Sequence, residues 1–378
     1  MNRLTHSVII LLVSLASFVI ATSTAIADQS LVNGQTSLET PTNHGGFPAF
    51  AFSPDGKLLA GGTGAVTTTV NGRKSVLGAE VLLWNARTGK LLKTLGKHGD
   101  SVRWVGFAQD GETLVSASRG DGVVKVWQMP AGRLRHTLRI EPAEKSVNTR
   151  WPQITLSDDG QTLVTISARS ISLGEESHVT TGGELAVWDL TTGEKLWSKP
   201  ESDAYAAALT PDGRGMVTVN YTVTELTTDD KGRTRFRAEH RLLSWQAKSG
   251  KVLATADLGR LATPQSVALL DGESVALVTS RGLSVRNRLS GEESRQIEWH
   301  KDRSFGEAQL ADDGGAVGRA KPGWIEIVDV ESGETKGVLT TEFPNHFWNV
   351  AFSSDLTRAA AHNSGSGGGP FILELATQ

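Results

Sequence analysis

The stretch Trp188–Gly193, with the sequence WDLTTG, decides the fold because its pattern recurs along the chain. In each full copy an acid or amide follows a Trp, and a Gly stands five residues after that Trp. Full copies begin at Trp84, Trp127, Trp188 and Trp245, and degraded copies begin at Arg286, Val328 and Leu373. Because such a repeat sets the architecture of a chain, we expect seven similar structural units.

A second recurring pattern, an Asp-Gly pair, precedes six of the seven copies. The pairs are Asp55-Gly56, Asp110-Gly111, Asp159-Gly160, Asp212-Gly213, Asp271-Gly272 and Asp313-Gly314, and Asp355-Leu356 holds the seventh position. Asp-Gly is typical of a type I′ hairpin turn, since both residues tolerate a positive φ. Apolar runs flank the pairs, as at residues 49–52 and 58–60. Each unit is therefore predicted to have four strands, with the tight turn between the first two and the Trp at the end of the third.

These units predict an all-β fold, a seven-bladed β-propeller of four-stranded antiparallel blades. Strand signals recur at regular spacing without a helical period, and four-strand units of this size pack radially as propeller blades. The seventh unit lacks a fourth strand, because its copy of the repeat stops at Gln378. Residues 34–40 resemble the fourth strand at 89–95. We therefore expect an N-terminal strand to complete the last blade and close the ring, which leaves no exposed edge there.

The second unit, from His98 to Trp127, resembles the WD-repeat family of propellers, and the repeats extend this resemblance over nearly all of residues 28–378. In that family a His, a Ser or Thr, an Asp and the Trp form a buried hydrogen-bonded network. The resemblance assigns these structural roles to His98, Ser118 (or Ser116), Asp121 and Trp127. Such a network gives the buried indole N–H the acceptor that it needs. The other units lack the full set.

Trp197 carries a second resemblance. The segment 188–197 is similar to the blade-docking motif of quinoprotein-like propellers. Equivalent positions in other units hold Lys93, His136, Ala254 and Arg295, so a single unit carries the motif. This resemblance implies an alternative function, as an envelope assembly component or a cofactor-dependent enzyme.

Residues 1–27 have the form of a signal peptide. Arg3 precedes an apolar core at residues 8–20, and the small residues Ala25 and Ala27 mark a cleavage site before Asp28. The apolar core is short for a membrane anchor, which needs about 20 residues. We therefore predict a mature chain, residues 28–378, that forms one propeller domain in the periplasm or outside the cell and keeps no stable membrane anchor.

Charge and cysteine content narrow the possible partners. The chain has a net charge of −3, and removal of Arg3 with the signal makes it −4 because residues 1–27 contain no acid. This balance gives no electrostatic basis for binding nucleic acid. The absence of Cys excludes disulfides and thiolate metal sites. We expect a monomeric propeller without a cofactor.

Neither catalysis nor metal binding is predicted. His98, Ser118 and Asp121 have the composition of a hydrolase triad, but the sequence contains no Gly-x-Ser-x-Gly elbow, and the structural network is the favoured interpretation. Four His residues lie between the fourth strand of one unit and the first strand of the next: His44, His98, His300 and His346. They belong to units one, two, six and seven, so they would have to converge from nonadjacent blades to hold a metal. We therefore expect no enzyme activity and no metal site.

Aromatic and Arg residues recur near the start of the first strands. The candidate partner-binding residues are Arg103, Trp104, Arg150, Trp151, Tyr205, Arg303, Phe305, Phe347 and Trp348. In a propeller these positions surround one mouth of the central channel, and Trp, Tyr and Arg are enriched in interface hot spots. The alternative is that the aromatic side chains wedge between the blades.

Three long loops, at residues 64–78, 170–183 and 222–240, follow the second strands of their units. The resemblance to WD-repeat propellers places them on the same face as the aromatic mouth. An Asn-Gly pair in the first loop and a Lys-Gly pair in the third predict hairpin extensions there. The three loops either bind a partner or are solvated segments without a binding role. We therefore predict a non-catalytic, secreted or periplasmic, WD-repeat-like scaffold that binds a protein or peptide through one face.

Overall fold

The computed structural model describes residues 32–41, 44–70, 73–118, 120–140, 153–172, 178–200, 202–228, 234–261, 264–279, 281–298, 307–311, 315–321, 324–340, 347–363 and 369–375. The proposed signal peptide lies outside these residues. The described part consists of strands, turns and loops, and it contains no helix that could cross a membrane.

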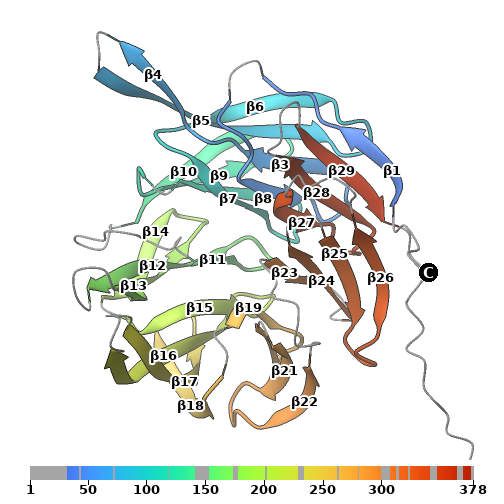
Figure 1. Cartoon of the computed structure of the whole chain (residues 1–378). Helices are drawn as coiled ribbons and strands as arrows, with labels where there is room; N and C mark the ends of the chain where they lie inside the picture. The colour runs from blue at the N-terminus through green and yellow to red at the C-terminus, as the bar shows by residue number, and fades with distance from the viewer. Residues whose placement is uncertain are drawn as a thin grey trace, which may run out of the picture.

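Seven antiparallel sheets stand around a central channel, as the sequence predicted (Figure 1). Blade one consists of β2 (Ala49–Phe52), β3 (Leu58–Gly62), β5 (Arg73–Asn85) and β6 (Leu91–His98), with β4 (Val66–Val70) as an additional strand that pairs with β5. Blade two consists of β7 (Val102–Phe107), β8 (Thr113–Ser118), β9 (Val123–Gln128) and β10 (Arg133–Arg139). Blade three consists of β11 (Gln153–Leu156), β12 (Thr162–Ser172), β13 (His178–Asp189) and β14 (Glu194–Lys199).

The remaining blades repeat this order. Blade four has β15 (Ala204–Leu209), β16 (Gly215–Thr228), β17 (Thr234–Gln246) and β18 (Lys251–Gly259), and blade five has β19 (Pro264–Leu269), β20 (Ser274–Thr279), β21 (Gly282–Asn287) and β22 (Glu293–Glu298). Blade six has β23 (Glu307–Leu310), β24 (Ala316–Lys321), β25 (Trp324–Asp329) and β26 (Thr335–Thr340). Blade seven has β27 (Phe347–Phe352), β28 (Arg358–Asn363), β29 (Pro370–Leu375) and, from the other end of the chain, β1 (Val32–Ser37).

The N-terminal strand closes the ring, which confirms the sequence-based expectation. β1 pairs antiparallel with β29, and Ser37 lies opposite Phe371. Beyond β1 the chain docks on blade one, where the amide of Glu39 donates to Gly89 O at 2.9 Å and Trp84 Nε1 donates to Glu39 O at 2.6 Å. The junction between the two ends is therefore held by a strand ladder and by a buried indole.

The turns between first and second strands differ from the type I′ turns that the Asp-Gly pairs led us to expect. Gly56 has a φ of 63°, but among the described residues only Asn349 and Leu356 combine a side chain with a positive φ. Asp55 therefore does not adopt the left-handed conformation. Its Oδ1 instead accepts hydrogen bonds from Ser53 Oγ at 2.7 Å and from the amide of Lys57 at 3.0 Å. Asp serves here for its carboxylate and Gly for its backbone freedom.

The hydrophobic core is divided into layers between neighbouring blades. Phe47 and Trp84 of blade one pack with Ala360 and Ile372 of blade seven, and the other clusters likewise join adjacent blades. The inner part of a blade is buried on both faces, so all six side chains of β8 are buried, whereas an outer strand such as β22 is mostly exposed. Stability thus depends on contacts between blades as well as on the strand ladders.

Candidate functional site

A cavity of about 380 Å³ lies along the central channel beside blades one, two and seven. The inner strands β2, β7 and β27 line it, together with Gln309 of β23. Its lining extends from Arg103 and Asn349, near the starts of inner strands, to Pro54 and Ser354 in the turns that follow them. The cavity therefore follows the inner strands along their length.

Arg103 and Trp104 are the sequence-predicted site residues that the structure places at this cavity. Arg103 is exposed, and Trp104 is half-buried against the cluster that blades two and three share. Gly106 makes room for the indole, because a Cβ at this position would come within 2.5 Å of a ring carbon of Trp104. Trp104 thus wedges between two blades and also presents part of its ring to the channel.

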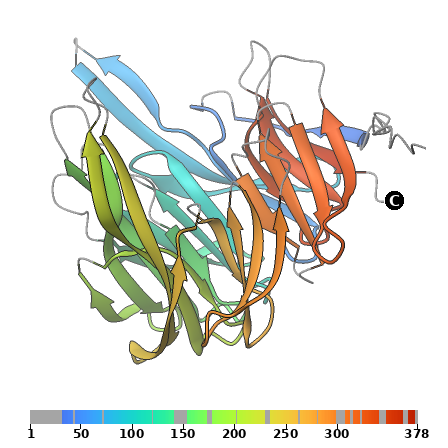
Figure 2. The same cartoon turned by 60° about the horizontal axis from the view of Figure 1, so that its bottom comes forward.

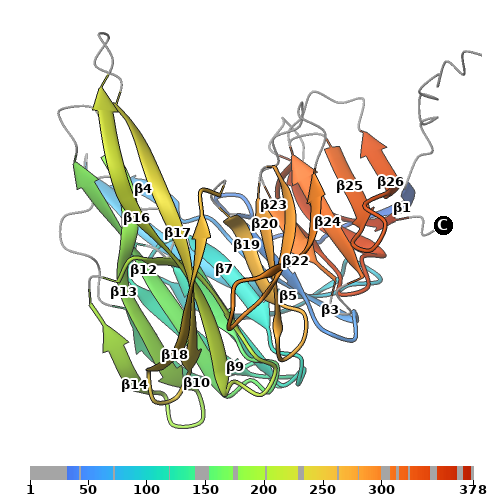
Figure 3. The same cartoon turned by 90° about the horizontal axis from the view of Figure 1, so that it is seen from below.

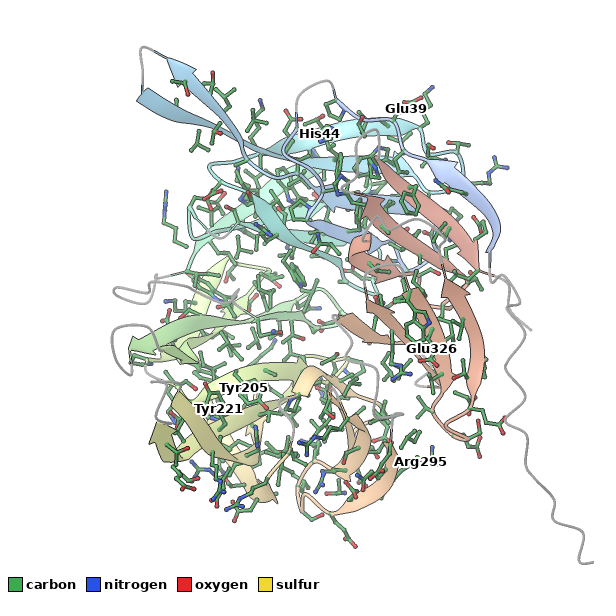
Figure 4. All side chains as sticks on the ribbon, in the orientation of Figure 1. Glu39, His44, Tyr205, Tyr221, Arg295 and Glu326 are labelled. Carbon is green, nitrogen blue, oxygen red and sulfur yellow. The ribbon has the colours of Figure 1, made fainter. Side chains whose placement is uncertain are left out.

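Tyr205 is placed differently. It packs within blade four beside Tyr221 (Figure 4), and the two rings have a centroid distance of 5.1 Å. The ring of His240 lies 6.0 Å from that of Tyr205. The Tyr205 hydroxyl is buried, and burial together with the nearby Tyr221 raises the pKa of Tyr205 above its ordinary value. This residue does not line the cavity.

The other predicted mouth residues are only partly covered by the structure. Arg150, Trp151, Arg303 and Phe305 lie outside the described residues. Phe347 and Trp348 begin β27, the inner strand of blade seven, and only their backbone is described. Of the nine candidates, the structure therefore places Arg103 and Trp104 at the cavity, while Phe347 and Trp348 precede the part of β27 that lines it.

The three long loops form hairpin extensions, which confirms the prediction for the first and third. β4 pairs with the first half of β5, the far ends of β12 and β13 pair with each other, and β16 pairs with β17 from Gly215 to Thr228. The extensions from blades one, three and four project on the same side of the ring (Figures 2 and 3). Val102 at the start of β7 lies opposite Ser118 at the end of β8, so the starts of the inner strands face this same side.

The extension of blade one carries exposed apolar residues. Val76 and Leu77 are each 52% exposed. The extension of blade four is charged instead, with Arg237 Nη1 2.7 Å from Glu225 Oε2. Sequence reasoning marked these loops by their length but not the apolar character of the first one.

In blade two, a buried hydrogen-bonded network links the four positions that the family resemblance indicated. Trp127 Nε1 donates to Ser116 Oγ at 2.9 Å, and His98 Nε2 lies 2.9 Å from the same oxygen. Ser116 therefore occupies the centre of the network, and Ser118 takes part in neither bond. His98 Nδ1 is 3.7 Å from Asp121 Oδ2.

Asp121 is held as a carboxylate. Its oxygens accept from the amides of Gly99 at 2.6 Å and Val123 at 2.9 Å. Partial burial alone would raise the pKa of Asp121, but the His98 ring and these amides outweigh that effect and lower the pKa to about 2. With Ser116 buried beneath an indole, this constellation lacks the exposed nucleophile of a hydrolase.

Blades three and four repeat the Trp bond without the His. Trp188 Nε1 donates to Thr165 Oγ1 at 3.0 Å, and Trp245 Nε1 donates to Thr218 Oγ1 at 2.9 Å. In each case the acceptor stands on the second strand, two residues beyond the residue that lies opposite the Trp. We call this pair of positions, on the third and second strands of a blade, the Trp slot.

Blades five and six fill the Trp slot with charged residues. In blade five, Arg286 stands at the Trp position and its Nη2 lies 2.8 Å from Glu293 Oε2. In blade six, Arg319 stands at the acceptor position, and it forms an ion pair with Glu326, which lies directly opposite on β25. Both side chains of the blade-six pair are buried, and Glu326 Oε1 also accepts from Thr335 Oγ1 at 2.6 Å.

Trp197 joins blade three to blade four. Its Nε1 donates to Ala247 O at 2.6 Å, and its ring lies against Gly250. Lys93 and Arg295, which the sequence places at the equivalent position, also donate to a backbone carbonyl of the next blade, Lys93 to Ala131 O at 2.6 Å and Arg295 to Val330 O at 3.3 Å. The contact at this position is therefore shared by several blades and does not depend on Trp.

The histidines do not assemble in the described part of the chain. His300 and His346 lie outside the described residues, and within them no group of three or more His, Asp and Glu residues is arranged to hold a metal ion. His44 packs against Phe47 with a ring centroid distance of 4.6 Å, and partial burial lowers its pKa.

Seven blades and a ring closed by the N-terminal strand define the class of this molecule, a seven-bladed β-propeller, and blade two adds a His–Ser–Trp network. A family model described as the WD domain, G-beta repeat, matches residues 89–128, which contain the whole network of blade two. The chain is also 35% identical over 113 residues to a protein named as an uncharacterized WD repeat-containing protein of Synechocystis sp.. That match covers 30% of this chain and 27% of the relative, so the chain spans about a quarter of the relative's length.

The chain is thus a seven-bladed β-propeller that is similar to WD-repeat proteins in its second blade. Propellers of this family commonly act as scaffolds for protein interactions. The relative's printed name adds no ligand or activity to this general property.

Proposed function

We propose that this propeller is a non-catalytic scaffold that binds a protein or peptide through the face bearing the three hairpin extensions. The observation that carries this proposal is the position of those extensions, which project on the side of the ring where the inner strands begin (Figure 3). Loops on a rigid frame are the usual carriers of binding function. Here they stand beside a channel mouth that includes Arg103 and Trp104.

The chemistry of this face supports a protein partner. Val76 and Leu77 add exposed apolar surface on the extension of blade one. Trp104 adds a rigid aromatic ring and Arg103 a charged, directional donor, which are the residue types that dominate protein interfaces. The net charge of −3 for the whole chain offers no comparable argument for a polyanion.

Partner capture with a matched control tests the proposal. The 28–378 chain is immobilised, exposed to envelope extracts of its native source, and bound proteins are identified by mass spectrometry. The double variant Val76→Ser, Leu77→Ser is expected to lose the specific partner. Leu253→Ser, on the outer strand β18, is the control because Leu253 is 51% exposed but lies away from this face. Equal capture by both variants would contradict the assignment of the binding face.

We also propose that the protein works in the periplasm or outside the cell, on the basis of the signal-like residues 1–27. Expression of the full chain in a bacterium followed by fractionation tests this point. The mature protein should appear outside the cytoplasm with Asp28 as its first residue, measured by intact mass. A cytoplasmic protein that keeps residue 1 would contradict the proposed export from the cytoplasm.

The alternative, an envelope assembly component of the quinoprotein-like type, is favoured by one observation, the docking of Trp197 on blade four. The two functions predict different crosslinked adducts when the protein is crosslinked in cells. A stable, large adduct that survives the Val76→Ser, Leu77→Ser change would favour the assembly component over a scaffold with a single binding face.

A further inference from the structure

Among the described residues, one inner strand contacts the next through a Gln side chain beside the channel cavity, although all seven inner strands have an equivalent position. Gln309, in blade six, reaches across to the inner strand of blade seven. Its Oε1 accepts from the amide of Phe352 at 3.1 Å, and its Nε2 lies 3.3 Å from the carbonyl oxygen of Phe352. The carboxamide thus satisfies both backbone groups of one residue, as a neighbouring strand would.

These two groups are free to make the contact because of the strand register. Ser353 N donates to Arg358 O, so the pair Ser353 and Arg358 is bonded within the ladder. The next pair, Phe352 opposite Ala359, must then be a non-hydrogen-bonded pair. The N–H and C=O of Phe352 consequently point away from β28, toward the channel side of β27.

The same register recurs on the two other inner strands that line the cavity. Ser53 N donates to Leu58 O in blade one, and Ala108 N donates to Thr113 O in blade two. Phe52 and Phe107, which end β2 and β7, therefore also direct their N–H and C=O groups toward the channel. Both residues line the cavity with Phe352.

At Phe52 and Phe107, the preceding blade has no side chain that could make the contact that Gln309 makes with Phe352. Gln309 is the penultimate residue of its inner strand, and the penultimate residues of the other six are Ala51, Gly106, Thr155, Ala208, Ala268 and Ala351. Ala351 packs toward the blade-one cluster that contains Phe52, and Ala51 packs toward the cluster that contains Val105 and Leu114 of blade two. Each Ala therefore lies on the side of its strand toward the blade that carries one of the two open backbone pairs, and both line the cavity.

We propose that this cavity is a carboxamide-binding site, in which the side chain of an Asn or Gln from a bound peptide makes the Gln309 contact at Phe52 or Phe107. The carboxamide is selected because one planar group must supply both a donor and an acceptor to an N–H and a C=O of the same residue. A carboxylate supplies only acceptors and an ammonium only donors. The identity of the ligand as a peptide rests on the proposed function, but the group that the cavity recognises does not.

Propionamide, the side-chain analogue of Gln, is the probe for this site, and propionate is its control. A ligand of so few atoms binds weakly, so concentrations on the order of 10–100 mM are appropriate. Saturation-transfer NMR with the 28–378 chain should detect propionamide and not propionate. Crystals soaked in propionamide should place its carboxamide against the backbone of Phe52, of Phe107 or of both.

Substitutions that bring a Gln side chain to the backbone N–H and C=O groups of Phe52 and Phe107 provide the decisive comparison. Ala351→Gln should block the place at Phe52, and Ala51→Gln should block the place at Phe107, so that the double variant binds propionamide at least about tenfold more weakly. Thr155→Gln puts the same side chain at the same strand position in blade three, outside the cavity, and should leave binding unchanged. Gln309→Ala should open a third place, and propionamide should then raise its melting temperature more than that of the unchanged chain.

Two results would overturn the proposal: no binding of propionamide to the unchanged chain, or binding that the double variant retains in full. Should the double variant fail to fold, the rescue of Gln309→Ala by propionamide but not by propionate still decides the matter. Failure of partner capture alongside propionamide binding would refute the scaffold and leave the site standing. Partner capture without propionamide binding would refute the carboxamide site and leave the scaffold function standing.

Discussion

Blades two to four and blades five and six fill the Trp slot in opposite ways. Trp127, Trp188 and Trp245 each bury a neutral indole and direct one N–H to a hydroxyl. Arg286 and Arg319 bring a guanidinium to the same region and require a carboxylate beside it. A neutral bond of this kind costs little to bury, whereas a buried charge is costly unless its partner stays in place. The degraded repeats therefore do not lack an interaction at this slot; they have one that depends more strongly on a second residue.

The largest expected effect comes from removing one partner of the buried blade-six pair. Glu326→Leu leaves the Arg319 guanidinium in an apolar blade, where both side chains are about 5% exposed or less. Loss of one partner of such a pair costs about 3–5 kcal/mol of unfolding free energy. The double change Arg319→Met, Glu326→Leu removes both charges and should recover most of that loss. Denaturant unfolding of the 28–378 chain measures both values, and a double variant as unstable as the single one would contradict this account.

A smaller loss is expected in blade two, where no charge is buried at the Trp slot. Ser116→Ala removes the acceptor of Trp127 Nε1 and the partner of His98 Nε2 at once. Unsatisfied buried polar groups of this kind cost about 1–3 kcal/mol. Ser118→Ala is the matched control, because Ser118 is equally buried but takes part in neither bond. Thermal unfolding should separate the two variants, and equal losses would contradict the central role of Ser116 in the network.

The Asp121 carboxylate makes the blade-two network sensitive to acid. Its pKa of about 2 in the folded protein lies below the ordinary value of 3.8 for an Asp carboxyl, so the folded state favours the ionised form. The stabilisation is fully present above about pH 4, and it is lost as the pH falls through the folded pKa. Asp121→Asn should therefore be less stable than the unchanged chain at pH 6, and the difference should narrow toward pH 2. A constant difference across this range, measured by thermal unfolding, would exclude a role for the charge.

Much of the architecture could be predicted because the repeat marks are local. Trp, Asp-Gly and Thr-Gly positions at fixed spacing identified the blades, and the unmatched segment 34–40 identified the closing strand. The turn type was predicted wrongly because Asp55 supports its turn through its side chain rather than through a positive φ. Spacing alone does not separate these two uses of Asp.

The candidate site was less accessible to sequence reasoning, for a physical reason. Whether an aromatic lies at a channel mouth or between blades depends on how neighbouring sheets approach, which no local pattern records. Tyr205 and Trp104 occupy similar positions in their strands, yet Tyr205 is enclosed by Tyr221 and His240 while Trp104 lines the cavity. The Gln309 contact carried a signal that could have been found, because Gln stands where six other inner strands have Ala, Gly or Thr. Recognising it required knowing that the position faces the next blade.

The smallest effect is expected in blade five, where the charged slot is more open than in blade six. Glu293 is 31% exposed against 4% for Glu326, so water screens its charge. Arg286 also keeps other partners, since its Nε donates to Ser284 Oγ at 2.9 Å and its Nη1 to Gly291 O at 3.0 Å. Glu293→Gln should therefore cost only about 0.2–1 kcal/mol, and added salt should shrink the difference because exposed pairs are screened. Glu326→Gln, measured beside it in low and high salt, should show a larger and nearly salt-independent loss. If the two variants behaved alike, burial would not be what separates the charged slots, and the contrast with the Trp-filled blades would have to rest on charge alone.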